Sequence, residues 1–237
     1  TRVIISDENF ERILYAIRLA YLETALSGEI CDIKKALPSI VSLARQCFLN
    51  EYVYTETPAE HEKITRLEAS ISDQADATTP EFQLNLAVLA MYRPLFRALP
   101  DKLLRILSES TLQEPFSSLV KVQIKEPIDE LEIKKHIPNL TPISDLTSNE
   151  VKSQYEENPY PRWQSSMLRT PKSVPSFVNM IAPKIPKHIP GFPSKPKVLI
   201  AGCGSGRHAI GAARRFKDSQ ILAVDLSLTS LAYGIRK

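Results

Sequence analysis

The chain has 237 residues, of which 43% are hydrophobic and 24% are charged. This composition is typical of a soluble globular protein with one large domain or two small ones. The net charge of +3 is too small to indicate nucleic-acid binding. No apolar run reaches the roughly 18–20 residues that would cross a bilayer, so we expect no membrane partner.

The cysteines and histidines follow no pattern of a metal site or a disulfide framework. The three cysteines, Cys31, Cys47 and Cys203, are far apart and include no C-x-x-C pair, and the four histidines are scattered. We therefore expect a cytoplasmic protein without a metal site. The chain begins with Thr1 rather than Met and shows no signal segment, so we interpret it as a fragment or a processed chain.

Residues 1–113 predict a mostly α-helical domain. Ser6 or Asp7 is a candidate N-cap, and Gly28 stands where the first helix should end. Between them, apolar side chains recur at the helical period. They are Phe10, Ile13, Leu14, Ile17, Tyr21 and Leu22.

Four further helices are expected in this region. They cover about 38–49, a segment after Pro58, a segment from Pro80 with Thr79 as its cap, and 100–110. Pro94 is expected to kink or end the helix that starts at Pro80. The helices suggest packed hairpins without a clean 34-residue repeat signature. A tetratricopeptide-like array that binds a protein partner and a helical domain that only packs its own core both stay open.

Residues 114–197 predict a strand, short helices and a proline-rich connector. The alternation of Val120, Val122 and Ile124 favours one strand. Helices are expected over 127–138 and 145–159, the second with Thr147 and Glu150 at capping-box spacing. Residues 159–196 hold nine of the eighteen prolines, which excludes a long helix and favours an extended connector lying on a surface.

Residues 198–237 predict the start of an α/β domain of the doubly wound, Rossmann-like type. The first 190 residues contain a single glycine, and then Gly202, Gly204 and Gly206 follow the apolar run 198–201 directly. A helix over about 207–216, the apolar run "ILAV" ending at Asp225, and a helix capped by Ser227 complete a β–loop–α–β–α order.

Two nucleotide-binding loops do not fit this glycine spacing. A P-loop requires Lys followed by Ser or Thr after its last glycine, and Arg207 and His208 follow Gly206 instead. The dinucleotide fingerprint G-x-G-x-x-G requires glycine where Arg207 stands. The observed spacing is G-x-G-x-G.

That spacing, with an acid at the end of the next strand, resembles motif I of class I S-adenosylmethionine-dependent methyltransferases. The resemblance implies that S-adenosylmethionine is the cofactor, that Asp225 accepts hydrogen bonds from both ribose hydroxyls, and that Leu226 lies against the adenine. The helix N-terminus near Arg207 would face the methionine carboxylate. The cofactor-binding residues implied are Gly202, Cys203, Gly204, Gly206, Arg207, Asp225 and Leu226. The family often has an acid where this chain has Ile200, so the cofactor's amino group needs another partner, for example a backbone carbonyl near Ala201 or Gly202.

The segment "QYEENPYPRW", residues 154–163, resembles a sequence that precedes the methyltransferase domain in a bacterial family. That family often carries tetratricopeptide-type helices upstream, and the resemblance covers roughly residues 80–237. It implies a lid or substrate-facing role for Tyr155, Tyr160, Arg162 and Trp163. The alternative is that the aromatic residues only attach the connector to the domain and that Arg162 forms a structural salt bridge.

These patterns together predict methyl transfer to an unidentified acceptor. In such enzymes the catalytic residues lie after the fourth strand, so we expect them beyond Lys237 and expect the chain alone to bind cofactor poorly and to be inactive. His208 is either an acid/base group or polar surface. Two other functions stay open: a non-catalytic helical interaction module with a degenerate nucleotide-binding domain, and an NAD(P)-dependent oxidoreductase.

Overall fold

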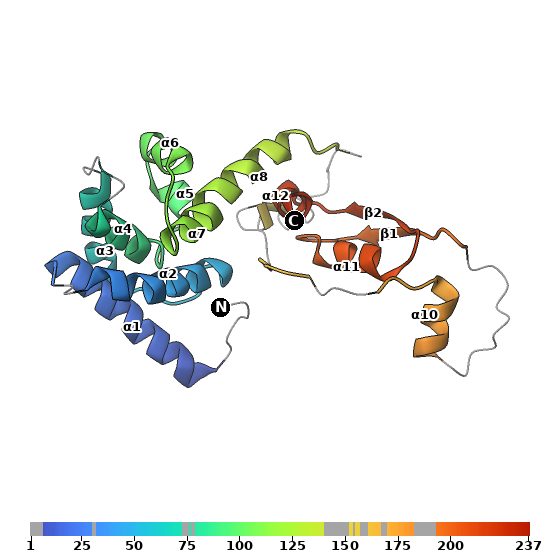
Figure 1. Cartoon of the computed structure of the whole chain (residues 1–237), viewed down its shortest axis with the longest axis horizontal. Coiled ribbons are helices and arrows are strands. Elements are labelled where there is room, and N and C mark those ends of the chain that lie inside the picture. The colour runs from blue at the N-terminus through green and yellow to red at the C-terminus, as the bar shows by residue number, and fades with distance from the viewer. Residues whose placement is uncertain are drawn as a thin grey trace. The chain divides into compact units, whose positions relative to one another are not determined.

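The computed structural model describes residues 7–29, 32–72, 76, 79–139, 152–153, 155–156, 161–166, 170–182 and 193–237. The chain divides into two compact units, 1–129 and 130–237. Figure 1 shows helices throughout the first unit, and a small sheet with helices in the second. Among the helices in the described ranges, none has the length and apolar character needed to span a membrane.

The first unit is helical, as the sequence predicts. Its elements are α1 (Glu8–Ser27), α2 (Ile33–Leu49), α3 (Pro58–Ser72), α4 (Pro80–Leu89), α5 (Leu95–Ala98), α6 (Asp101–Glu109), α7 (Phe116–Val120), the π-helix η1 (Lys121–Lys125) and the first part of α8 (Glu126–Lys135). Helix α8 crosses from the first unit into the second.

Local signals set several of these helix ends. The Asp7 side chain caps α1 by accepting from the Phe10 N–H, and Gly28 ends that helix with a φ of 72°. The Thr79 side chain caps α4. The prediction for α2 was wrong at its start, because the helix begins at Ile33 and contains Pro38. The Asp32 side chain accepts from the Lys35 N–H and so stabilises an additional turn ahead of the proline.

The strand predicted around Val120–Ile124 is wrong, since these residues are helical. Leu119, Val120, Gln123 and Ile124 are buried, which is helical spacing. The polar residue Gln123 can point inward because its side-chain amide is fully hydrogen-bonded. Its oxygen accepts from the Leu95 N–H and the Tyr52 hydroxyl, and its nitrogen donates to the carbonyls of Ala44 and Ala90. The amide thereby joins three backbone segments of the core and the Tyr52 side chain.

A buried ion pair joins α1 to α3 in the same unit. The side chains of Arg18 and Glu60 are 1% and 2% exposed, and a guanidinium nitrogen lies 3.6 Å from a carboxylate oxygen. Glu60 also accepts hydrogen bonds from the Tyr15 hydroxyl at 2.6 Å and the Thr57 N–H at 2.9 Å. The Arg18 guanidinium carbon lies 4.3 Å from the ring centre of Tyr92, a cation–π contact. Two charges removed from water are thus compensated by each other and by polar neighbours, although Arg18 Nε and Glu60 Oε1 have no hydrogen-bond partner among the described residues.

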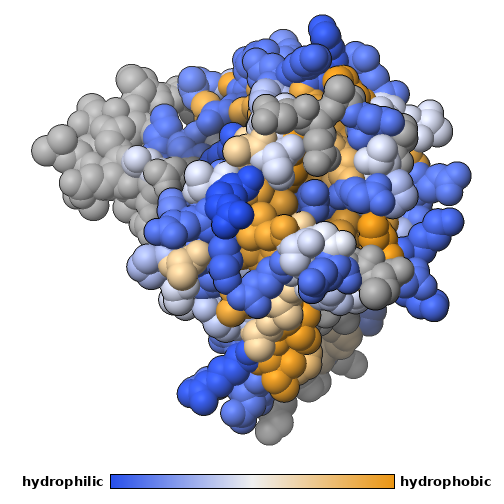
Figure 2. Space-filling view, turned by 90° about the vertical axis from the view of Figure 1, so that its left-hand side faces the viewer, coloured by the Kyte–Doolittle hydropathy of each residue, from blue (hydrophilic) through white to orange (hydrophobic). Residues whose placement is uncertain are grey.

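Part of the predicted apolar face of α1 is not covered by the described residues. Leu22 is fully buried, whereas Phe10, Ile13 and Ile17 are between 39% and 53% exposed. Figure 2 shows hydrophobic surface gathered among hydrophilic side chains on the helical unit. The first half of α1 therefore presents an apolar stripe rather than a core face.

The second unit contains the predicted β–loop–α–β–α order. Strand β1 (Lys197–Ala201) pairs in parallel with β2 (Gln220–Val224), helix α11 (Arg207–Arg215) connects them, and α12 (Leu228–Arg236) follows with Ser227 as its cap. Ile200, Cys203 and Ala212 form the core between the sheet and α11. The described residues of this unit form a small α/β structure with a two-stranded parallel sheet, which fits the α/β start that the sequence predicts.

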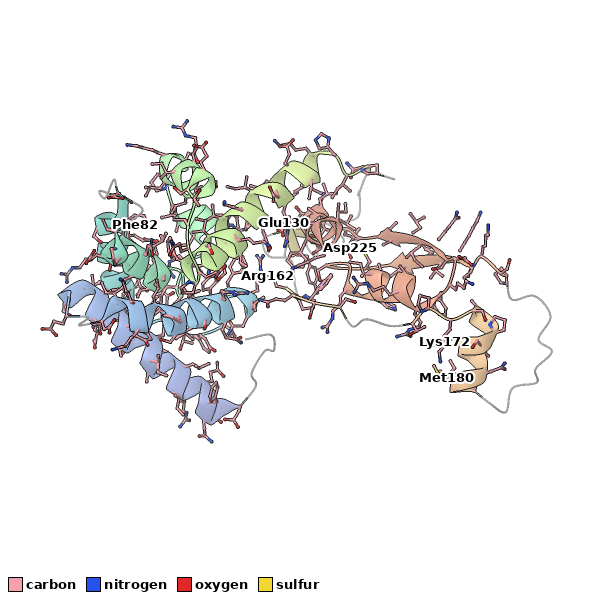
Figure 3. All side chains as sticks on the ribbon, in the orientation of Figure 1. Phe82, Glu130, Arg162, Lys172, Met180 and Asp225 are labelled. Atoms are coloured by element: carbon pink, nitrogen blue, oxygen red, sulfur yellow. The ribbon has the colours of Figure 1, made fainter. Side chains whose placement is uncertain are left out.

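The proline-rich connector is partly described. It contains the eight-residue helix α10 (Val174–Ile181), none of whose residues is buried. The backbone of Lys172 exchanges hydrogen bonds with Arg215 and Lys217 next to α11, and its ammonium group donates to the Met180 sulfur at 3.2 Å (Figure 3). This part of the connector therefore lies on the surface of the α/β unit, as expected.

We expect Glu60→Gln to lower the free energy of unfolding by about 3–5 kcal/mol, because it leaves the buried Arg18 charge without its anion. Glu62→Gln, which alters an exposed carboxylate of α3, should change it by less than about 0.5 kcal/mol. Urea denaturation followed by far-ultraviolet circular dichroism measures both. Equal stability of the two variants would contradict the assignment.

The ion pair should also make the stability depend on pH. Burial raises the pKa of Glu60, but hydrogen bonds from Tyr15 and Thr57 and the charge of Arg18 outweigh it, so that the pKa lies below its ordinary value. The stabilisation is therefore complete above the unfolded pKa of about 4.3 and is lost as the pH falls through the lower folded pKa. Between about pH 5 and pH 3, wild type should lose stability more steeply than Glu60→Gln in the same denaturation experiment.

Candidate functional site

The three glycines between β1 and α11 all have a backbone conformation that favours glycine. The φ angles of Gly202, Gly204 and Gly206 are 66°, 52° and 78°. Gly206 has an additional steric reason, since a Cβ there would lie 3.1 Å from the Cα of Gly234 in α12. A Cβ on Gly234 would in turn lie 3.2 Å from the Cα of Gly206. The loop thus reverses the chain tightly and lets α12 approach its backbone.

Asp225 follows the last residue of β2 and lies beside this loop (Figure 3). One carboxylate oxygen accepts from the Gly204 N–H at 2.7 Å, and the other accepts from the Ser227 N–H at 2.9 Å. These bonds fix the direction of the carboxylate. Each oxygen keeps a second lone pair, so the half-buried group can accept further hydrogen bonds from a ligand.

The N-terminus of α11 is open for an anionic group. Its N-cap is Gly206, and no side chain caps it. The backbone bond from the Ile210 N–H to the Gly206 carbonyl closes the first turn, whose earlier N–H groups have no partner within an α-helix. The helix dipole places partial positive charge there, and the side chains of Arg207 and His208 are exposed beside it.

The loop, Asp225 and the start of α11 line one cavity of 1480 Å³. It is larger than the roughly 300–1,000 Å³ of usual small-molecule sites. All seven residues predicted to bind the cofactor line it: Gly202, Cys203, Gly204, Gly206, Arg207, Asp225 and Leu226. Ala201 and His208 also line it, whereas Ile200 is 8% exposed and belongs to the core under the sheet.

The thiol of Cys203 has a raised pKa, which does not favour a role as a nucleophile. Burial raises its pKa, and the nearby charge of Asp225 raises it further. The thiol form therefore dominates at neutral pH, whereas reactive cysteines have lowered pKa values. Cys203 contributes to the core and to the loop backbone.

The residues predicted to form a lid separate into two groups. Tyr155 is 43% exposed and lines the cavity, as does Pro161. Arg162 and Trp163 are each 7% exposed, and within the described segment 161–166 they do not line the cavity. Tyr160 lies outside the described residues. The placement of Trp163 favours the interpretation that it attaches the connector to the domain.

Trp163 contacts both the loop and α12. Its indole N–H donates to the Ser205 carbonyl at 2.9 Å, and its own carbonyl accepts from the Tyr233 hydroxyl at 2.5 Å. The rings of Trp163 and Tyr233 meet edge to face at 6.2 Å. The sequence analysis assigned no role to Ser205 or Tyr233, because 42 and 70 residues separate them from the tryptophan.

Glu156 is another residue without a role in the sequence analysis. Its carboxylate accepts from the Thr229 N–H at 3.2 Å in the first turn of α12 and pairs with Lys134. Burial raises the pKa of Glu156, but the contacts with Lys134 and Thr229 outweigh it and lower the pKa. Glu156 thus adds a tertiary hydrogen bond to the first turn of α12, beside the Ser227 cap, and its position within the "YEEN" motif gives no local sign of that distant partner. The role of Gly234 had one sign in the sequence, because a glycine inside a helical pattern often marks a close contact between backbones.

Two further sources of information, metal-binding clusters and similar proteins, do not identify the function of this cavity. Within the part of the chain that the structure describes, no cluster of three or more His, Cys, Asp or Glu side chains could hold a metal ion. Comparisons with protein-family models, with curated proteins and with solved structures find no match.

We expect Gly206→Ala to destabilise the α/β unit by more than about 1 kcal/mol, because alanine at a positive φ is strained and its Cβ meets the backbone of Gly234. Gly211→Ala is the matched control, since Gly211 lies inside α11 and its Cβ would meet nothing within 4 Å. That variant should be neutral or stabilised by roughly 0.5–1 kcal/mol. Trp163, the single tryptophan, reports unfolding of this unit by fluorescence. A Gly206→Ala variant as stable as Gly211→Ala would contradict the close backbone approach.

Proposed function

We propose that the unit 130–237 binds S-adenosylmethionine and that the protein transfers its methyl group to an acceptor. The supporting observation is that a positive-φ glycine loop, a fixed carboxylate and an uncapped helix N-terminus line the same cavity. The glycine loop would let the backbone approach the cofactor closely, and the fixed carboxylate would bind its vicinal ribose hydroxyls. The helix N-terminus would bind its carboxylate.

The residues present fit the cofactor. The remaining lone pairs of Asp225 would accept from the ribose hydroxyls, and the N–H groups at the start of α11 would bind the methionine carboxylate. Leu226, which is 39% exposed and lines the cavity, would cover the adenine. Because Ile200 is buried in the core, the amino group would use the backbone around Ala201 or Gly202, both of which line the cavity.

When bound, the cofactor supplies an electrophilic methyl group on its sulfonium. The work left to the protein is to hold an acceptor in line with that group and to exclude water. The cavity volume of 1480 Å³ leaves room for part of an acceptor beside the cofactor. Tyr155 and Pro161 lie on its wall and would contact the acceptor. His208 also lines the cavity, but we assign no residue to removal of the acceptor's proton. The acceptor itself is not assigned.

The helical unit supports a second candidate function, protein binding. The exposed stripe of Phe10, Ile13 and Ile17 on α1 is the observation that favours it.

For the cellular location we keep the cytoplasm as our proposal, because Cys47 and Cys203 are both free thiols.

We expect S-adenosylhomocysteine to bind the full-length protein with micromolar affinity in calorimetric titration. Asp225→Ala should weaken it by about 1–3 kcal/mol, the scale of lost hydrogen bonds to a charged group. Asp218→Asn is the matched control, since this carboxylate is exposed and asparagine tolerates its positive φ of 55°. The control should bind as wild type does, and NAD should not bind.

Two results would overturn the proposed function. Binding of NAD in place of S-adenosylhomocysteine would favour an oxidoreductase. Binding of neither nucleotide would leave the glycines with a purely structural role and would favour the interaction module.

A further inference from the structure

We propose that Trp163 is a positioning residue that orients the end of the glycine loop for an anionic group of the ligand. The inference rests on the proposed nucleotide binding and deepens it, because it assigns to Trp163 the amino-acid end of the ligand rather than a place in a lid. It follows from two paired contacts between the connector and the loop.

The first contact joins the connector to the loop in both directions. The Trp163 indole N–H donates to the Ser205 carbonyl at 2.9 Å, and the Ser205 hydroxyl donates to the Pro161 carbonyl at 2.8 Å. Ser205 is 2% exposed and Trp163 is 7% exposed, so water does not readily replace either bond. The residue immediately before the N-cap of α11 is therefore held through both its backbone and its side chain.

The second contact holds Trp163 itself against α12. The Tyr233 hydroxyl donates to the Trp163 carbonyl at 2.5 Å, and the two rings pack edge to face. The next residue, Gly234, is the one that approaches Gly206. Loop, connector and α12 thus form a closed set of contacts around the peptide bond between Ser205 and Gly206.

The orientation of that peptide bond determines where α11 begins. The Ser205 carbonyl and the Gly206 N–H belong to the same peptide group, and this N–H donates to the Cys203 carbonyl at 3.1 Å. Glycine populates positive and negative φ about equally, so the peptide before Gly206 rotates at low cost unless it is held. The Cys203 carbonyl holds the N–H side of this peptide group and the indole N–H holds its carbonyl side, and together they fix the direction of the first N–H groups of α11.

The ribose end of the ligand would be bound by Asp225, whose position does not depend on Trp163. The Asp225 carboxylate is held by the N–H groups of Gly204 and Ser227. Among the described residues, the hydrogen bonds of Trp163 join it to Ser205 and Tyr233, and its ring also contacts the Lys237 ammonium group, but neither contact is with this carboxylate. Loss of the indole N–H should therefore affect recognition of an anionic group at α11 and leave hydroxyl recognition at Asp225 intact.

Trp163→Phe tests this separation, because phenylalanine keeps an aromatic ring against Tyr233 and removes the N–H. S-adenosylhomocysteine and 5′-methylthioadenosine are titrated by calorimetry; both carry adenosine and a thioether, and only the first carries the amino-acid carboxylate. We expect Trp163→Phe to weaken the first by about tenfold or more and the second by less than about twofold. Asp225→Ala should weaken both ligands.

Hydrogen exchange without ligand provides a second readout. Trp163→Phe should speed exchange of the hydrogen-bonded backbone amides of Gly206 and Ile210 and leave those of the β1–β2 ladder unchanged. Tyr233→Phe, which removes the hydroxyl that holds the Trp163 carbonyl, should change the same amides to a smaller extent.

The outcomes separate this inference from the proposed function. If wild type binds S-adenosylhomocysteine but Trp163→Phe weakens both ligands equally or neither, the positioning role is wrong and the proposed function stands. Faster exchange throughout the unit would show that Trp163 only stabilises the fold, which also overturns the positioning role. If wild type binds neither ligand, the proposed function fails and this inference fails with it.

Discussion

The close approach of Gly206 to Gly234 is the constraint on which the geometry of the candidate site depends. Because neither residue has a side chain, the backbone of α12 can lie against the end of the loop. That position brings Tyr233 next to Trp163, and Trp163 in turn reaches the Ser205 carbonyl. A side chain at either glycine would push α12 away from the loop and separate these contacts. The two glycines therefore matter for the close approach of α12 as well as for the positive φ angle at Gly206.

The two units solve the problem of buried polar groups in different ways. In the helical unit, Arg18, Glu60 and Gln123 are nearly or fully inaccessible, and each is compensated by partners from other helices. In the α/β unit the polar groups meet at the edge of a cavity, where Asp225 is fixed by two backbone N–H groups and still has lone pairs to offer. The first arrangement specifies a core, whereas the second leaves capacity for a ligand.

Local patterns predicted most elements because their causes are local. Side-chain caps at Asp7, Thr79 and Ser227 and the glycine at position 28 act within four residues, so the sequence contains the whole interaction. The alternation around Val122 misled the analysis because the decisive partners of Gln123 lie 28 to 79 residues away. A buried amide with four tertiary hydrogen bonds has no local signature. The roles of Ser205, Glu156 and Tyr233 were not predictable for the same reason, whereas the cavity residues followed from the glycine spacing and the acid at the end of β2.

Cys203 gives the site a chemical property of its own. The thiol lies between two positive-φ glycines, lines the cavity and has a raised pKa, so it is mostly protonated at neutral pH and should react slowly with an alkylating reagent. Cys47 is fully buried in the other unit, and burial raises its pKa to about 12. Alkylation of Cys47 therefore requires an opening of the helical unit, whereas a ligand in the cavity would shield Cys203 from the reagent.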